Sequence, residues 1–163
     1  MAVILGIDPG SRIAGYGVIL SDGFEISHID HGVIRFSEKK SLPERLFDMR
    51  RALDQLIKQY QPTEIVVEGM FLGKNPQSAF VLGHVRGVCL ERGVAHGLGI
   101  FEYAARTIKK SLTGNGNAAK DQVRSMVLHY LNVSTELPLD ATDALAVALT
   151  HGRHVSRTTE ARI

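Results

Sequence analysis

Val3-Ile4-Leu5-Gly6-Ile7-Asp8-Pro9-Gly10 predicts a buried β-strand that ends in a carboxylate. A similar arrangement returns in Ile65-Val66-Val67-Glu68, whose continuous β-branched run is typical of a strand covered on both faces. A carboxylate in an apolar setting is costly unless it is paired or bound to a metal. Neither Asp8 nor Glu68 therefore has an obvious structural role.

Two further acidic residues, Asp140 and Asp143, open the apolar segment Ala141–Leu149. Because they are three positions apart, they project from one face of a helix. Acidic residues in a first turn also interact favourably with the positive end of the helix dipole, so capping explains this pair as well as metal binding does. For Asp140 and Asp143 taken alone, both interpretations stay open.

The N-terminal part of the chain predicts an antiparallel meander, with Asp22-Gly23 as its turn signal. After the first strand, strands are expected over Tyr16–Ile19, Phe24–Ile29 and Gly32–Phe36. Later strands are expected over Glu64–Glu68 and Gly99–Tyr103. A three-stranded antiparallel meander followed by alternating helices and strands indicates an α/β fold: a mixed sheet, in which the later strands are parallel, flanked by helices.

Helices are predicted over residues 43–60, 75–92, 118–131 and 139–151. The first has a capping box, Ser41 to Glu44, with Pro43 inside its first turn. Asn117, at the end of the loop Leu112–Asn117, is a candidate cap for the third helix.

The chain has 163 residues, 44% hydrophobic and 22% charged, which is the composition of a globular protein with a real core. We expect one domain over residues 1–154 and a frayed tail over 155–163. No apolar run is long enough for a membrane span and no secretory leader is evident, so a cytoplasmic protein is expected. The single cysteine, Cys89, fits a small buried hydrophobe better than a nucleophile.

The net charge is only +2, but basic residues cluster after the strand expected over Gly99–Tyr103. No acidic residue occurs from Ala104 to Lys120, where the cations are Arg106, Lys109, Lys110 and Lys120, and Arg124 follows. A basic stripe beside an acidic site suits a polyanionic substrate, although a solvated helix face is the simpler explanation.

Four carboxylates on core elements indicate a divalent-metal site. Hard oxygen ligands select magnesium or manganese over zinc, and His151 and His154 are expected at the surface rather than among the ligands. Two such ions can activate a water and stabilise the leaving oxygen of a phosphodiester.

Four motifs, in order and spanning residue 2 to His154, resemble the RuvC family of Holliday-junction resolvases. They are Gly6-Ile7-Asp8-Pro9-Gly10-Ser11-Arg12 with Gly15-Tyr16-Gly17; Glu68 with Phe71 and Lys74-Asn75; Phe101-Glu102-Tyr103-Ala104-Ala105-Arg106; and Asp140-Ala141-Thr142-Asp143-Ala144-Leu145-Ala146.

The resemblance implies an RNase H-like fold and a homodimer that cleaves four-way DNA junctions symmetrically, leaving 5′-phosphate and 3′-hydroxyl ends. It implies one or two Mg²⁺ ions per subunit, with Mn²⁺ as a substitute, and the RuvA and RuvB branch-migration proteins as partners. The helix from Asn75 is the candidate dimer interface.

The resemblance also assigns roles to individual residues. Asp8, Glu68, Asp140 and Asp143 match the catalytic, metal-binding carboxylates. Lys109 and Lys120 match lysines that act near the scissile phosphate or bind DNA, and Phe71 matches an aromatic used at the junction centre, although a core phenylalanine remains the alternative. The other predicted DNA contacts are Lys74, Arg106, Lys110 and Arg124.

Several other functions fit the sequence less well. The Asp8-Pro9-Gly10-Ser11 loop is similar to the first phosphate loop of actin-like ATP-binding proteins, but those need two such domains. A related RNase H-like nuclease acting on RNA, including the YqgF type, is a nearer alternative, and a junction-binding module without catalysis is another. A Rossmann fold is excluded because the glycines lack G-x-G-x-x-G spacing.

Overall fold

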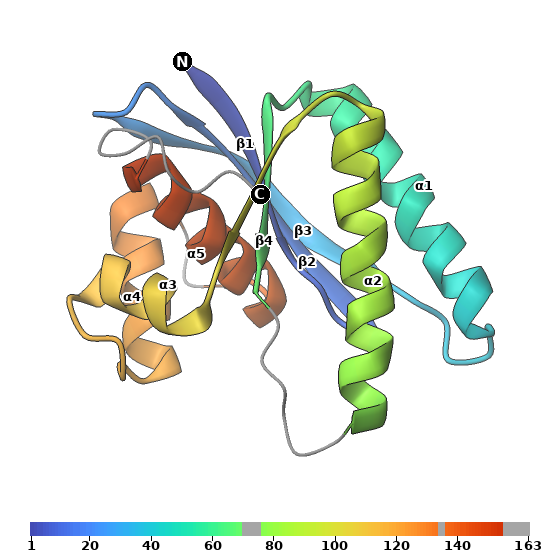
Figure 1. The fold of residues 1–163 in the computed structure, drawn as a ribbon. Helices are drawn as coiled ribbons and strands as arrows, with labels where there is room; N and C mark the ends of the chain where they lie inside the picture. Colours follow the sequence, from blue (N-terminus) through green and yellow to red (C-terminus); the bar gives the residue numbers. More distant parts are fainter. Residues whose placement is uncertain (70–75, 134–135, 155–163) are drawn as a thin grey trace.

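The computed structural model describes residues 1–69, 76–133 and 136–154 (Figure 1). Its elements, in chain order, are β1 (Ala2–Asp8), β2 (Ile13–Ser21), β3 (Ile26–Arg35), α1 (Leu42–Tyr60), β4 (Glu64–Glu68), α2 (Pro76–Ala95), β5 (Gly99–Tyr103), α3 (Ala105–Thr113), α4 (Lys120–Leu131) and α5 (Leu139–His154). None of the helices in these ranges is long and apolar enough to cross a membrane.

The strands form one mixed sheet in the order β3-β2-β1-β4-β5. β1 pairs antiparallel with β2, and β2 pairs antiparallel with β3. β4 lies parallel to β1 on the other side, and β5 lies parallel to β4. The predicted mixed α/β sheet is confirmed, and the two strands that end in Asp8 and Glu68 are neighbours.

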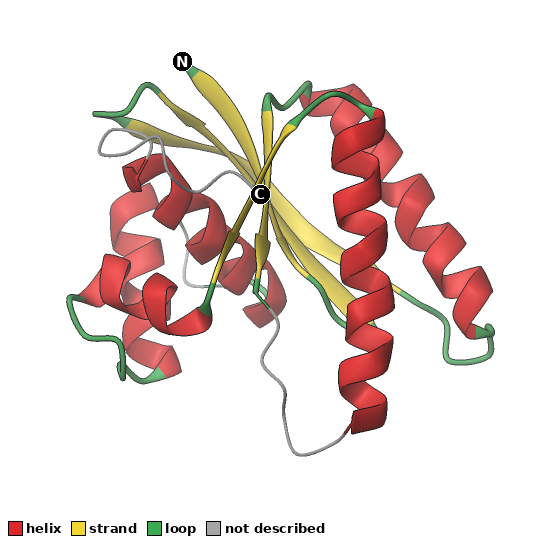
Figure 2. Cartoon of the chain, in the orientation of Figure 1, coloured by secondary structure: helices red, strands yellow, loops and turns green. Residues whose placement is uncertain are grey.

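Helices cover both faces of the sheet (Figures 1 and 2). Side chains alternate along each strand, so Leu5 and Ile7 pack in one core with α1 and α2, while Ile4 packs in the other with α3, α4 and α5. Both cores are built from fully buried aliphatic residues, which explains why the central strands carry continuous apolar runs.

α5 lies close against β1 and β2 because three positions that face it lack a side chain. A Cβ atom at Gly6 would lie 2.4 Å from the Ala144 carbonyl oxygen, one at Gly15 1.8 Å from the Asp140 carbonyl oxygen, and one at Gly17 2.6 Å from Leu145 Cδ2. Any larger residue at these positions would push the helix away from the sheet. These glycines therefore set the distance between the sheet and the acidic first turn of α5.

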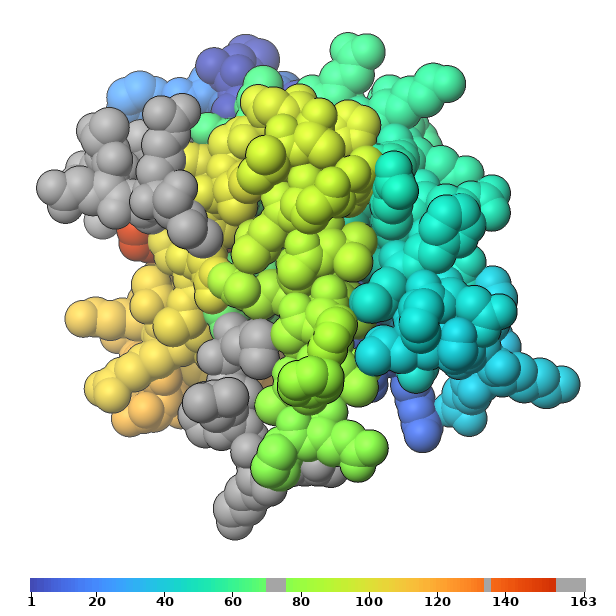
Figure 3. All heavy atoms as spheres, turned by 45° about the vertical axis from the view of Figure 1, so that its right-hand side comes forward, coloured from blue at the N-terminus to red at the C-terminus, as the bar shows by residue number. Residues whose placement is uncertain are grey.

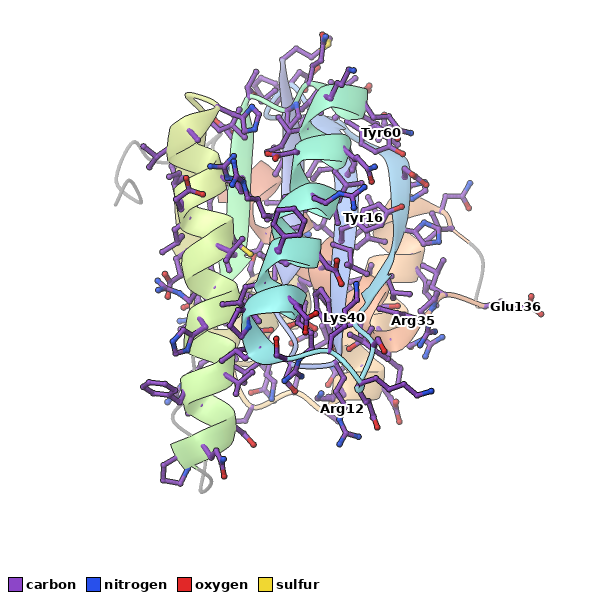
Figure 4. All side chains as sticks on the ribbon, turned by 90° about the vertical axis from the view of Figure 1, so that its right-hand side faces the viewer. Arg12, Tyr16, Arg35, Lys40, Tyr60 and Glu136 are labelled. Carbon is purple, nitrogen blue, oxygen red and sulfur yellow. The ribbon has the colours of Figure 1, made fainter. Side chains whose placement is uncertain are left out.

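α1 confirms the predicted capping box. The backbone N–H and the hydroxyl of Ser41 each donate to Glu44 at 2.7 Å, and Gln61, in the left-handed conformation at φ 47°, ends the helix. At the end of α1, Tyr60 donates a hydrogen bond to Asp30 of β3, as does Tyr16 of β2 at 3.4 Å, so both tyrosines lie on the α1 side of the sheet (Figure 4). The helix is thus fixed to the sheet edge by polar contacts as well as by its apolar face.

The predicted three-stranded meander is confirmed, but the break expected between Phe24–Ile29 and Gly32–Phe36 is absent. Residues 26–35 form one continuous strand, and Asp30 and His31 pair with Val18 and Gly17 instead of turning the chain. A register shift between Val18 and Ile19 absorbs one extra residue of β3 as a bulge. The polar dipeptide that suggested a break therefore lies inside a half-exposed edge strand.

Two predictions around the third helical region are also wrong. α3 was not predicted; its only fully buried residues are Ile108 and Leu112, too few for a clear helical pattern. Asn117 does not cap α4: Ala119 is the N-cap, while the Asn117 N–H donates to Asn115 Oδ1 at 2.9 Å. The Asn115 side chain thus stabilises the loop, and Asn117 contributes only its backbone N–H.

The sequence also leads to predictions about the burial of the single cysteine and of the two C-terminal histidines. Cys89 is buried as predicted, and burial raises the pKa of its thiol to about 12, which excludes a nucleophilic thiolate. His151 was expected at the surface but is only 2% exposed, with its ring nitrogens 2.9 Å from the Tyr103 hydroxyl and 3.0 Å from Glu64 Oε2. Those polar partners make its burial possible. His154 is half-buried.

Candidate active site

A cavity of about 310 Å³ lies where β1 and β4 end and α5 begins. All four predicted carboxylates and two of the predicted lysines line it, together with apolar residues from α3, α4 and α5. The lining residues are Asp8, Glu68, Ala105, Ile108, Lys109, Lys120, Val123, Asp140, Asp143 and Ala146.

Asp8 and Glu68 reach this cavity because their strands run in the same direction. The parallel register pairs Ile7 with Val67, so the next residue of each strand arrives at the same edge of the sheet. The two carboxyl groups are hydrogen-bonded to one another. The carboxyl ends of parallel strands are where open α/β sheets place their chemistry.

Asp140 and Asp143 come from the other end of the chain. Gly15 is the β2 partner of Asp8 and is also the residue against which the Asp140 carbonyl rests. The helix that carries both aspartates is therefore seated directly beside Asp8. The capping interpretation of this pair does not exclude a ligand role, because the same first turn faces the acidic cavity.

Burial and mutual repulsion disfavour the ionised carboxylates. The pKa of Asp8 is raised to about 8, first by burial and then by the charges of Glu68 and Asp143. Burial is also the main cause of the raised pKa values of Glu68 and Asp143, against which the Lys120 charge acts. Without a bound cation, the Asp8–Glu68 pair therefore retains a proton at neutral pH.

This proton has a consequence for stability that can be measured. Because the folded-state pKa of Asp8 lies above its unfolded value near 3.8, the folded protein binds more protons, so the stabilisation is complete below pH 4 and is lost as pH rises through about 8. In EDTA we expect the free energy of unfolding to fall with rising pH by up to about 1.4 kcal/mol per unit between pH 5 and 7.

Chemical denaturation of wild type and Asp8→Asn across this range would isolate the effect. The variant lacks the titrating carboxyl, so its stability should depend less on pH in the same buffers. Identical pH profiles would contradict the proton assignment.

Two lysines place positive charge in the same cavity. Lys109 comes from α3 and Lys120 from the first turn of α4, and the Lys120 Nζ lies 4.0 Å from Asp143 Oδ2. Both charges act to lower the pKa of Glu68. The Lys120 side chain is 88% exposed, so its ammonium can approach an anion that enters from solvent.

The remaining predicted DNA contacts lie outside the cavity. Lys110 lines a second hollow with Phe24, Arg106 packs over Gly116, and Arg124 donates to the Leu137 carbonyl oxygen. Phe71 and Lys74 lie outside the described residues. Sequence reasoning did not single out the apolar lining, Ala105, Ile108, Val123 and Ala146, because these residues come from three different helices and carry no common sequence signal.

The acidic groups do not form a ready-made metal cage. Among the described residues, no three histidine, cysteine, aspartate or glutamate side chains are grouped as a complete metal site. The donors are nevertheless all oxygen, and they share one cavity. This set fits a hard cation that takes part of its shell from water or substrate, as Mg²⁺ commonly does.

A model of the protein family described as crossover junction endodeoxyribonuclease RuvC matches residues 4–151. The chain belongs to the RuvC family. The resemblance seen in the four sequence motifs is thereby confirmed.

Individual RuvC proteins match over nearly the same length. The crossover junction endodeoxyribonuclease RuvC of Legionella pneumophila is 45% identical over 151 residues, 93% of this chain and 87% of the relative. That of Geotalea uraniireducens is 47% identical over 148 residues, 91% of this chain and 86% of the relative. A solved structure of Thermus thermophilus RuvC in complex with a Holliday junction substrate superposes with a TM-score of 0.92 at 27% identity and covers 100% of both chains.

The solved structures also support the fold. A second structure of Thermus thermophilus RuvC gives a TM-score of 0.90 over 99% of both chains at 27% identity. The yeast mitochondrial Holliday junction resolvase Ydc2, at 14% identity and a TM-score of 0.64, shares the fold. The predicted RNase H-like architecture of the RuvC family is therefore confirmed for this chain.

Proposed function

We propose that this protein is an endonuclease that resolves four-way DNA junctions in recombination and repair. The observation that carries the proposal is the single cavity in which Asp8, Glu68, Asp140 and Asp143 meet Lys109 and Lys120 in a chain of the RuvC family. Acidic oxygens beside lysines suit hydrolysis of a phosphodiester better than recognition alone. A binding module without catalysis would have no use for buried, mutually repelling carboxylates.

The four carboxylates would hold Mg²⁺, with Mn²⁺ as a substitute and one or two ions per subunit. When bound, the metal supplies an activated water and neutralises charge on the leaving 3′-oxygen. Asp8 is central to such binding because it is hydrogen-bonded to Glu68 and is the group most affected by the neighbouring negative charges. Its proton must leave before a cation can be held, so activity should rise with pH.

Lys120 and Lys109 would act on the phosphate itself. Lys120 stabilises the negative charge that develops on the phosphate, and its exposed stem allows the ammonium to follow the substrate. The products are a 5′-phosphate and a 3′-hydroxyl, which a ligase can rejoin. Phe71 and Lys74 would contact the junction near its centre, and Arg106 and Lys110 are the other proposed contacts.

A homodimer would place two such sites on a two-fold symmetric junction. The candidate interface is one face of α2, which runs across the molecular surface beside α1 (Figure 3). A hollow of about 770 Å³ follows this face and is lined mostly by apolar or small residues: Pro76, Ala79, Phe80, Gly83, His84, Gly87, Val88 and Glu91. Phe80 is 69% exposed there, which favours an unsatisfied contact surface.

Phe80→Glu should therefore convert the protein to a monomer. A charge placed in an apolar contact loses its hydration without gaining a partner, so the dimer should dissociate at micromolar concentration. Light scattering would measure the mass of wild type and variant. Phe47→Glu, on α1 and 56% exposed in the wild type, is the matched control and should stay dimeric. A monomeric wild type, with or without junction DNA, would contradict the dimer.

Two further parts of the proposal come from family membership. Association with RuvA and RuvB would couple cleavage to branch migration, and the protein would work in the cytoplasm on chromosomal DNA. The described residues identify no surface for these partners.

The decisive experiment incubates the protein with a synthetic four-way junction, a matched linear duplex and an RNA–DNA hybrid, each with Mg²⁺ or EDTA. Paired nicks in the junction only, absent in EDTA, are expected. Cleavage of the hybrid instead would move the function to RNA processing. Tight junction binding without cleavage under any metal would favour the binding module.

A further inference from the structure

Arg124 lies one helical turn after Lys120 on α4, so both side chains project from the same face of that helix. Lys120 reaches Asp143, which follows the first turn of α5. Arg124 reaches the chain just before α5, where its Nη2 donates to the Leu137 carbonyl oxygen at 2.9 Å. The two cations of α4 therefore act on adjacent parts of the same acidic element.

The Leu137 carbonyl is the last backbone acceptor before the hydrogen-bond ladder of α5. The ladder begins at the next residue, because the Pro138 carbonyl accepts from the Thr142 N–H at 3.0 Å and from the Thr142 hydroxyl at 3.1 Å. Pro138 has no side-chain acceptor that could cap the helix. The direction in which the chain enters α5 is therefore set by contacts from outside the helix.

Three such contacts surround the entry to α5. The Leu137 side chain is 7% exposed and packs in the core, Gly15 supports the Asp140 carbonyl from the sheet, and Arg124 holds the Leu137 carbonyl from α4. A guanidinium is suited to this role because its planar donors keep a fixed direction. Arg124 is half-buried, whereas the Lys120 side chain beside it is almost fully exposed.

We propose that Arg124 is a positioning residue for the metal site, which orients Asp140 and Asp143 by fixing the start of α5 and does not contact DNA. This inference rests on the proposed nuclease function and replaces the DNA-contact role predicted for Arg124 from its charge. Lys120 acts on the substrate, and Arg124 holds the carboxylates toward which Lys120 points.

Two substitutions separate geometry from charge. Arg124→Lys keeps the positive charge but loses the planar donor, and Arg124→Met loses both while keeping an apolar stem. If Arg124 acts by positioning Asp140 and Asp143, both substitutions should lower the cleavage rate at saturating junction by about ten-fold, since small displacements of reacting groups slow a reaction strongly. Arg51→Met, an exposed arginine on α1, is the control and should behave as wild type.

A second measurement needs no substrate. In DNA-free protein, Mg²⁺ should raise the Tm by binding the folded state. Arg124→Lys should need several-fold more Mg²⁺ for half of that rise, because its charge is unchanged and only the carboxylate geometry differs. Junction affinity and its dependence on salt should equal those of the wild type for both variants.

The outcomes are distinct. A weaker junction affinity with a salt slope reduced by about one unit would make Arg124 a phosphate contact and overturn the proposal. Wild-type cleavage and Mg²⁺ titration in Arg124→Lys would show that charge alone matters and would also overturn it. If wild type cuts no junction, the proposed function fails, while the Mg²⁺ titration still tests the positioning role.

Discussion

Asp8→Asn is expected to abolish junction cleavage while junction binding persists. The substitution removes one anionic oxygen from the centre of the cavity, beside Glu68, and leaves the shape of the side chain unchanged. Metal-assisted hydrolysis depends on several kcal/mol of charge stabilisation, so we expect a fall in rate of at least about 10³-fold. Single-turnover cleavage of a labelled junction would measure it.

Binding should survive because it arises from basic side chains that contact phosphates. A gel-shift titration in EDTA should give the wild-type affinity or a tighter one, since a buried negative charge has been removed. The same variant should also be more stable than wild type in EDTA above pH 8, where the wild-type carboxyl must ionise. Normal cutting by this variant would refute the metal assignment.

Gly15→Ala is expected to damage both stability and activity. Its Cβ would lie 1.8 Å from the Asp140 carbonyl oxygen, and both atoms belong to backbone that is fixed by the sheet and the helix. Overpacking of this kind costs about 1–3 kcal/mol or more. For a chain of this size we expect the Tm to fall by roughly 5–10 °C, with a loss of cleavage from the displaced α5.

Gly87→Ala provides the matched control for stability alone, because Gly87 also lines the hollow of the candidate dimer interface. A Cβ there meets nothing within 4 Å, and the residue is in the interior of α2, so alanine should be neutral or should stabilise by up to about 1 kcal/mol. Calorimetry on both variants would compare them directly. A Gly15→Ala protein as stable and active as wild type would mean that α5 is not seated by the missing side chain.

The elements that are predicted best from the sequence are those whose residue pattern directly reflects burial or a local hydrogen bond. β4 is predicted over the residues that form it, because its short β-branched run is typical of a strand covered on both faces. β5, an edge strand, is also predicted over the residues that form it. α1 is predicted within one residue at its start because its cap is a local hydrogen-bond pattern. α3 is not predicted, because its two buried residues are too few to show a helical periodicity.

The active site, too, has some features that the sequence predicts and others that depend on tertiary contacts. That Asp8 and Glu68 meet follows from adjacent parallel strands, which sequence order and apolar runs together indicate. Asp140 can join them only because Gly15 has no side chain and lets the two backbones approach closely. In the sequence, such a contact between backbones is marked by nothing more than the glycine itself. Arg124 was assigned from its charge, and only the tertiary contact with Leu137 gives it a different role.

The acidic cavity combines the first and the last of the described elements, because Asp8 ends β1 while Asp140 and Asp143 belong to α5. During synthesis on the ribosome, the sheet residues emerge first, and the glycine-lined surface of β1 and β2 has no helix to cover it until α5 follows. If the proposed function is right, a nascent chain cannot cut DNA, because Asp140 and Asp143 are missing until almost all of the described chain has been made. The long sequence separation also makes docking of α5 a late step in folding, since contacts of this kind close slowly. A nuclease built in this order acquires its activity and its native fold together.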